Sequence, residues 1–236
     1  MKQYHNIFIL TGAGISAESG LATFRSSNGL WNNHRVEDVA SIEGFERNPD
    51  LVHDFYNNLK VEVQNVVPNA AHNAITLLQN KYPADVNVIT QNVDTLHEKA
   101  GNENVYHIHG QINQAVCLNC GNVLETWGDV DTQTECSSCG IASMMKPNIV
   151  FFGENLLCMD KVEVLLRKCD LFISIGTSGV VFPAAGFVQT AKYYGADTIE
   201  FTLDTTANNY LFDKHIYGKA GETFPKFVDE LLKSIS

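Results

Sequence analysis

The sequence has 236 residues, a length typical of one large domain or of a large domain with a small insert. Hydrophobic residues make up 44% and charged residues 18%, and the mean hydropathy is −0.09, which excludes a disordered chain and a coiled coil. The 16 basic and 27 acidic side chains give a formal net charge of −11, which disfavours nucleic acid as a partner.

No apolar run approaches the roughly 20 residues that a membrane-spanning helix needs. The apolar segment near the N-terminus, residues 7–10, is too short for a signal peptide. We therefore expect a cytoplasmic protein that does not bind membranes. In that reducing compartment the six cysteines should not be paired by default, so their spacing must decide their role.

Short apolar runs alternate with helical periodicity along the chain. Residues 7–11 are predicted to form a buried strand that ends at Gly12. Further strands are predicted over residues 86–90, 171–175 and 197–203, and helices over 50–60, 70–79, 160–168, 182–194 and 224–235. This alternation predicts an α/β fold with a Rossmann-like parallel sheet that is covered by helices on both faces.

Two stretches interrupt the alternation and predict a smaller lobe. Residues 34–68 are polar and mixed, with one helix, and residues 111–148 carry paired cysteines. The Rossmann-like domain is then expected to comprise residues 1–33, 69–110 and 149–236. Ligands of such sheets bind beyond the carboxyl ends of the strands. Here those ends are glycine-rich or polar, at residues 12–14, 91–94, 176–178 and 202–204.

The loop after the first strand, residues 12–17, satisfies the pattern G-x-G-x-x-A. Its glycines permit close approach to a pyrophosphate, whose charge is met by N–H groups at the start of a helix. The alternative is an ordinary glycine turn with a helix cap. The acidic residue that usually binds the ribose about 20 residues later is missing, which disfavours a dehydrogenase.

Four cysteines have the spacing of a zinc ribbon. Two C-x-x-C pairs are separated by 15 residues, and neither precedes a helix, which favours zinc over thioredoxin-like redox chemistry. Four protein ligands leave no open position for water, so one zinc ion is expected to be structural. The predicted ligands are Cys117, Cys120, Cys136 and Cys139. Cys158 and Cys169 are interpreted as small apolar residues of the core.

In this order and spacing, the motifs resemble the sirtuin family of NAD-dependent protein lysine deacylases, over residues 8–227. The residues that carry the resemblance are 12–16, 18–20, 23–25, 91–94, 109–110, the four cysteines, 152–154 and 176–178. Residues 33–40 resemble a bacterial-type branch related to enzymes that remove succinyl as well as acetyl groups.

The resemblance implies that His109 is the general base. In the family's mechanism the acyl-lysine carbonyl attacks C1′ of the nicotinamide ribose, nicotinamide leaves, and the histidine helps to deprotonate a ribose hydroxyl. An imidazole with a pKa near 6.5 can accept that proton at neutral pH. His107, by contrast, is interpreted as a packed strand residue.

The resemblance also implies which residues bind the co-substrate NAD. Asn92 and Asp94 would bind the nicotinamide end, and Phe24 would cover the reactive sugar. Helix capping or turn formation is the alternative for several of these residues, including Ser16 and Thr177. The full implied set is Gly12, Ala13, Gly14, Ser16, Ala17, Phe24, Arg25, Trp31, Gln91, Asn92, Asp94, Gly176, Thr177, Ser178, Thr202, Leu203, Asp204 and Ala220.

The implied partners are proteins or peptides that carry an acylated lysine. Such a peptide would add as a strand between residues 149–154 and 178–182, and the acyl chain would enter an apolar tunnel. The tunnel residues serve equally well in a hydrophobic core. The implied substrate-binding set is Tyr56, Ile108, Val150, Phe151, Phe152, Gly153, Glu154, Gly179 and Val180.

One departure from the family pattern bears on the acyl group. Enzymes of the acidic-acyl branch carry a tyrosine and, three residues later, an arginine that together hold a succinyl carboxylate. Tyr56 matches, but the arginine position is Leu59, which is interpreted as packing. We therefore expect acetyl or another uncharged acyl group to be preferred, unless Lys60 points inward and replaces the arginine.

Two other functions remain open from the sequence. A protein ADP-ribosyltransferase would use the same NAD site with a different nucleophile, and a non-catalytic zinc module would only sense NAD. The chain is expected to be a monomer.

Overall fold

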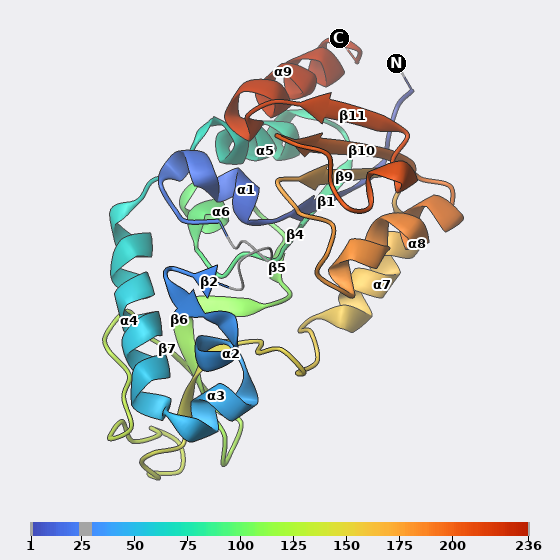
Figure 1. Cartoon of the computed structure of the whole chain (residues 1–236). Helices are drawn as coiled ribbons and strands as arrows, with labels where there is room; N and C mark the ends of the chain where they lie inside the picture. The colour runs from blue at the N-terminus through green and yellow to red at the C-terminus, as the bar shows by residue number, and fades with distance from the viewer. Residues whose placement is uncertain (1, 24–29, 236) are drawn as a thin grey trace.

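The computed structural model describes residues 2–23 and 30–235 and contains a central parallel sheet of six strands (Figure 1). The order of the strands is β11-β10-β9-β1-β4-β5, which is the order of a Rossmann fold. Their bounds are β1 Asn6–Thr11, β4 Asp85–Thr90, β5 Val105–His107, β9 Leu171–Ile175, β10 Asp197–Thr202 and β11 Lys214–Tyr217. Within the described ranges, no helix has both the length and the apolar character needed to cross a bilayer.

Alternate residues of β1 belong to two hydrophobic cores, because successive side chains of a strand point to opposite faces. Ile7 and Ile9 pack with α5 (Ala70–Lys81) and α9 (Ala220–Lys233). Phe8 and Leu10 pack on the other face with α7 (Met159–Lys168) and α8 (Phe187–Tyr193). Figure 1 shows the two helix pairs on opposite sides of the sheet. The predicted α/β sandwich is therefore confirmed.

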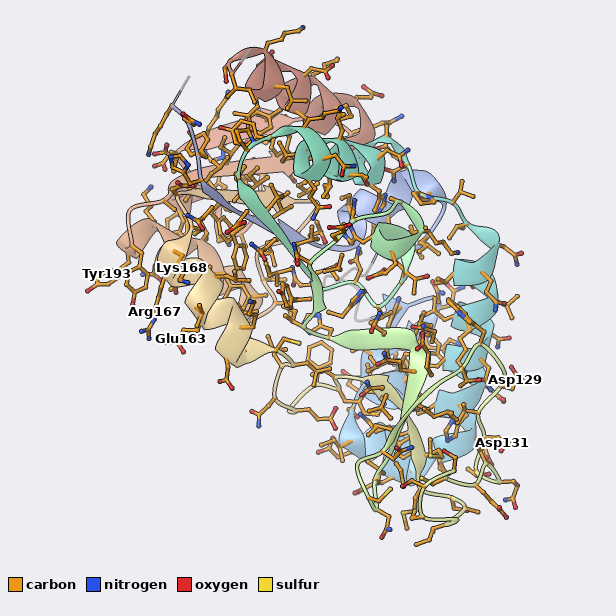
Figure 2. The ribbon with its side chains drawn as sticks, turned by 180° about the vertical axis from the view of Figure 1, so that it is seen from behind. Asp129, Asp131, Glu163, Arg167, Lys168 and Tyr193 are labelled. Atoms are coloured by element: carbon orange, nitrogen blue, oxygen red, sulfur yellow. The ribbon has the colours of Figure 1, made fainter. Side chains whose placement is uncertain are left out.

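Helix α7 shows why only one side of each covering helix is apolar. Val162 and Leu166 are buried against the sheet, whereas Glu163 and Arg167 form an ion pair one turn apart on the outer face. Figure 2 shows Glu163 and Arg167 pointing away from the sheet, on the same side as Tyr193 of α8. The apolar positions recur with the period of a helix and decide which side packs.

Several predicted boundaries differ from the structure. The helix expected over residues 182–194 is a 3-10 turn, Ala184–Gly186, followed by α8 from Phe187. The last helix begins at Ala220, four residues earlier than expected, with Pro225 inside it. Strand β11 was not predicted, because its burial is partial and its residues show no apolar run.

The smaller lobe contains more regular structure than the sequence predicted. Helices α2 (Val36–Val39) and α3 (Ile42–Arg47) precede α4 (Pro49–Asn65), in which Asn48 accepts a hydrogen bond from the N–H of Leu51 and Pro49 occupies the first turn. A hairpin, β2 (Leu30–Trp31) with β3 (His34–Arg35), precedes them.

The cysteine-containing segment forms a second, three-stranded antiparallel sheet. Its order is β7-β6-β8, with β6 Gly110–Cys117, β7 Val123–Glu125 and β8 Met145–Ile149. These strands were missed because they are short, or because their pattern is interrupted: the β6–β8 register shifts between Gly110 and Ala115. A short helix, α6 (Leu96–Lys99), lies between β4 and β5.

Gly110 joins the two sheets and has a positive φ of 84°. A Cβ at this position would lie 1.8 Å from the carbonyl oxygen of Asn148, which is a backbone atom that cannot move aside without displacing β8. We predict that Gly110→Ala lowers the free energy of unfolding by more than about 2 kcal/mol, since strain at positive φ and overpacking add.

Urea unfolding measures this loss, and Gly195→Ala is the matched control. Gly195 also has a positive φ, 90°, but nothing lies within 4 Å of a Cβ there, so a loss of only about 1 kcal/mol is expected. Equal losses in the two variants would contradict a steric role for Gly110.

Candidate functional site

A cavity of about 810 Å³ lies at the carboxyl ends of the central strands and extends to the smaller lobe. Its polar side is formed by residues that follow four strands, and its other side by α4 and the segment after β8. In a Rossmann fold this is the crevice in which ligands bind, at the point where the strand order reverses between β1 and β9.

Three glycines form the floor of the cavity at this point. A Cβ on Gly12 would lie 2.8 Å from the carbonyl oxygen of Gly176, and a Cβ on Gly14 would lie 2.6 Å from the Cα of Gly176. The N–H of Gly14 donates to the Gly176 carbonyl at 2.9 Å. Because side chains are excluded here, a dinucleotide can approach the backbone closely, so the cradle fits NAD.

Polar side chains behind the cradle form a buried network. Ser16 Oγ donates to Asp94 Oδ2 at 2.9 Å, and Asn92 Nδ2 lies 3.2 Å from both Gly12 O and Ser16 Oγ. Asp94 Oδ1 accepts from the N–H of Leu96, at the start of α6. Asn92 and Asp94 are both buried, so their orientation is fixed by these contacts.

His109 lines the cavity between the two lobes. Its Nδ1 lies 2.9 Å from the carbonyl oxygen of Gln91. Because a carbonyl only accepts, Nδ1 carries the proton and Nε2 keeps a lone pair. Burial lowers the pKa of His109, and the hydrogen bond to Gln91 offsets this only in part. The neutral imidazole is therefore favoured, in the tautomer that has a basic Nε2.

The four cysteines meet at one end of the smaller lobe. The Sγ atoms lie within 4.8 Å of one another, with 3.8 Å between Cys117 and Cys139 and 3.6 Å between Cys120 and Cys136. A tetrahedral ion with Zn–S bonds of about 2.3 Å requires sulfurs about 3.8 Å apart. The chain thus fits one structural zinc ion.

Two equivalent turns present these sulfurs. The N–H of Gly121 donates to Cys117 O and the N–H of Gly140 donates to Cys136 O, both at 2.8 Å. Both glycines have a positive φ, 72° and 70°. Each turn therefore reverses the chain directly after the second cysteine of its pair.

Most of the residues implied by the resemblance line the cavity. They are Gly12, Ala13, Gly14, Ser16, Ala17, Trp31, Gln91, Asn92, Asp94, His109, Val150, Phe151, Phe152, Gly153, Glu154, Gly176, Thr177, Ser178, Thr202, Leu203, Asp204 and Ala220. Phe24 and Arg25 lie outside the described residues.

Four residues of the implied substrate-binding set do not line this cavity. Ile108 is fully buried, and it packs in the core with Phe8 on the face of the sheet covered by α7 and α8. Tyr56 is fully buried in the core of the smaller lobe. Gly179 packs against Asn208, and Val180 is exposed.

Two residues of α4 were not expected at the site. Leu59 and Val63 line the cavity, one turn apart on the helix. Their spacing of four residues is visible in the sequence, but it predicts only that Leu59 packs in a core. The apolar face of α4 faces both the core of the smaller lobe and the cavity, and the sequence pattern does not distinguish the two environments.

The zinc site predicts the effect of losing one ligand. Cys120→Ser is expected to lose the bound zinc and to lower the melting temperature, because three thiolates and a hydroxyl bind zinc less tightly and the metal stabilises β6, β7 and β8. Metal analysis by mass spectrometry measures the zinc per chain. Cys158→Ser is the control: Cys158, which the sequence placed in the core, is exposed and lies outside the cluster, whereas Cys169 is buried as expected. Equal zinc contents in the two variants would contradict this assignment.

Comparisons with known proteins agree with the fold and the cavity. A sequence model of the Sir2 family matches residues 12–183. The NAD-dependent protein deacylase of Vibrio parahaemolyticus is 52% identical over 231 residues, which cover 97% of this chain and 96% of that protein.

Two solved structures are also similar. A Sir2 homologue in complex with NAD has a TM-score of 0.90 and 37% identity, over 99% of this chain and 91% of the other. Sir2Af2 bound to a myristoylated histone peptide has a TM-score of 0.76 and 34% identity, over 99% and 94%. The chain, with its glycine cradle, its cavity histidine and its four-cysteine cluster, therefore belongs to the Sir2 family.

Proposed function

We propose that the protein is an NAD-dependent protein-lysine deacylase that prefers uncharged acyl groups. The observation that carries this function is the position of His109, whose basic Nε2 belongs to a cavity bounded by a dinucleotide cradle on one side and an apolar wall on the other. The names of the relatives support NAD-dependent deacylation, and the complex of Sir2Af2 supports an acyl-lysine peptide as the substrate.

Each part of the cavity has a distinct task in this proposal. The cradle of Gly12, Gly14 and Gly176 binds the pyrophosphate, while Asn92 and Asp94 bind and orient the nicotinamide amide. Bound NAD supplies an electrophilic ribose carbon, C1′, with nicotinamide as the leaving group. His109 then accepts a proton at Nε2 from a ribose hydroxyl, and its Nδ1–H remains bound to the Gln91 carbonyl.

The side of the cavity next to α4 is suited to an uncharged acyl group. Leu59 and Val63 line it, together with Phe151 and Trp31. Among the described residues that line the cavity there is no lysine or arginine. Glu154 also lines it, but its carboxylate is paired with Lys146, so a succinyl carboxylate would meet no free cation among the described lining residues.

Two buried lysines near this wall have other partners. Lys60 Nζ donates to Gly128 O at 2.8 Å and to Asn57 Oδ1, so it points into the smaller lobe and does not replace the missing arginine. Lys146 Nζ donates to Ile149 O and Glu154 Oε2, at 2.8 and 2.9 Å. Recruiting either lysine for a succinyl carboxylate would leave buried acceptors unpaired.

The electrostatics of His109 predict the acid limb of the pH profile. The neutral imidazole is the active form, and its pKa is lowered, so activity should persist as the pH falls below the ordinary histidine value of about 6.5. We expect the midpoint of the acid limb of kcat/KM to lie below 6.5, and His109→Ala to lower kcat by about 10²- to 10⁴-fold.

The exposed His5 provides the control for this profile. His5→Leu should have the same kcat as the parent and the same midpoint of the acid limb of kcat/KM. A midpoint well above 6.5, or a His109→Ala variant as fast as the parent, would be incompatible with His109 as the base.

Acyl selectivity follows from the α4 wall. We expect kcat/KM to be higher on an acetyl-lysine peptide than on its succinyl counterpart, because an unpaired buried carboxylate costs on the order of several kcal/mol. Leu59→Arg should raise the succinyl-to-acetyl ratio, whereas Leu59→Met, which conserves volume without charge, should not. A parent enzyme that favours succinyl-lysine would refute the preference while leaving the deacylase function intact.

The function itself is tested with NAD labelled in the adenosine half. Release of nicotinamide that depends on the acyl-lysine peptide, with the label recovered on acyl-ADP-ribose, supports deacylation. Label fixed on protein would support ADP-ribosyl transfer, and binding of NAD without turnover would support a sensing module.

A further inference from the structure

The segment that follows β4 is held by an unusual set of donors. Four consecutive carbonyl oxygens, of residues 90–93, accept hydrogen bonds from residues 107–112. The first and the last are backbone bonds, but the two between them come from imidazole rings. The donors in order are Ile108 N (3.0 Å), His109 Nδ1 (2.9 Å), His107 Nδ1 (3.0 Å) and Ile112 N (2.8 Å).

His107 differs from His109 in what its second nitrogen contacts. Nδ1 faces the carbonyl oxygen of Asn92, and Nε2 lies 2.8 Å from Glu98 Oε1 on α6. A carbonyl and a carboxylate both accept only, so both ring nitrogens must carry protons. The ring can donate to both acceptors only as an imidazolium, and it is buried to 7% exposure beside Glu98.

The groups around this pair are consistent with that charge. Burial is the largest single effect on Glu98 and raises its pKa, but the hydrogen bond from His107, the Coulomb interactions with His107 and His97 and a backbone hydrogen bond together lower the pKa overall, which favours the carboxylate form. His97, on the same helix, is the other histidine that faces His107, and burial lowers its pKa. Asp94 faces His97 in turn.

The hydrogen-bond partners of His97, Asn102 and Thr11, fit a neutral ring. Asn102 Nδ2 donates to the His72 carbonyl and to Thr76, so its Oδ1 accepts from His97 Nδ1 at 2.6 Å. His97 Nε2 then accepts from the hydroxyl of Thr11 at 3.0 Å. Of the rings of His97 and His107, only that of His107 faces two groups that can only accept.

The anchored carbonyl belongs to a residue whose side chain lies in the cavity. Asn92 lines the cavity and contacts Gly12 O and Ser16 Oγ, whereas His107 does not line it. We propose that His107, as an imidazolium paired with Glu98, is a positioning residue that fixes the Asn92 backbone and thereby the nicotinamide-binding end of the site. This inference rests on the proposed function, which assigns Asn92 and Asp94 to nicotinamide.

The protonation state is tested by ¹⁵N NMR of the histidine rings in the parent and in Glu98→Gln. In the parent, both ring nitrogens of His107 should carry protons at neutral pH. In Glu98→Gln, the amide can donate to Nε2, so the ring should be neutral with its proton on Nδ1. A singly protonated His107 ring in the parent would overturn the proposal.

The positioning role is tested by direct binding, which does not depend on turnover. His107→Leu should weaken nicotinamide binding in the presence of ADP-ribose by tenfold or more, because a hydrogen bond from a charged donor is lost. ADP-ribose affinity should change much less than nicotinamide affinity, since His107 is linked to the glycine cradle only through Asn92, and Gly14 and Gly176 contact each other directly. Glu98→Gln keeps the Nδ1 donor and should lose less nicotinamide affinity than His107→Leu. His5→Leu is the matched control and should bind both ligands as the parent does.

The outcomes of these measurements distinguish a failure of the positioning role from a failure of the proposed deacylase function. Parallel losses of ADP-ribose and nicotinamide affinity in His107→Leu would show a merely structural role and overturn the inference. Normal nicotinamide affinity in that variant would overturn it too. If His107→Leu does not fold, the ring spectra and the binding measurements on Glu98→Gln decide. A parent that binds nicotinamide but removes no acyl group would refute the function alone.

Discussion

The close backbone contact between Gly14 and Gly176 sets the geometry on which the rest of the site depends. These residues follow β1 and β9, the two central strands between which the chain order reverses, and the absence of side chains lets the two loops touch. Gly176 also has a positive φ of 64°. Any side chain here would separate the loops, fill the cradle and displace the first turn of α1 (Ala13–Ser16) from the dinucleotide position.

Next to these glycines, the backbone carbonyl groups that follow β4 are held in place by side-chain donors. Beyond Thr90 the chain leaves β4, and ladder pairing with β5 ends, so imidazole donors take over where backbone N–H groups cannot reach. Two histidines two residues apart, one at the end of β5 and one in the turn after it, thus have different hydrogen-bond partners. His109 faces one acceptor and the cavity and stays neutral, whereas His107 faces two acceptors and is charged.

The side of the cavity that we assign to the acyl group has no lysine or arginine among its described lining residues. Helix α4 offers Leu59 and Val63 to the cavity. The nearby Lys60 is bound to oxygens of the smaller lobe, and Lys146 is bound to Ile149 O and Glu154 Oε2. In the proposed function, selectivity then arises from the cost of an unpaired charge. Membership of a family does not fix that cost, because a single residue at the arginine position changes it.

The sequence by itself determined the parallel sheet, the zinc ligands and the loops at the strand ends. Each is local: a buried strand, a C-x-x-C pair or a glycine turn is defined by residues close together in the chain, and the carboxyl ends of parallel strands then meet at one edge. Only the tertiary structure decided which side chains lie in the core and which line the cavity. Ile108 and Tyr56 proved to be core residues, Leu59 proved to line the cavity, and His107 acquired two acceptors from α6 and the β4 loop. The sequence spacing of an apolar residue is the same whether it lies in the core or lines the cavity. The charge of the His107 imidazole depends on hydrogen-bond partners that come from other segments of the chain.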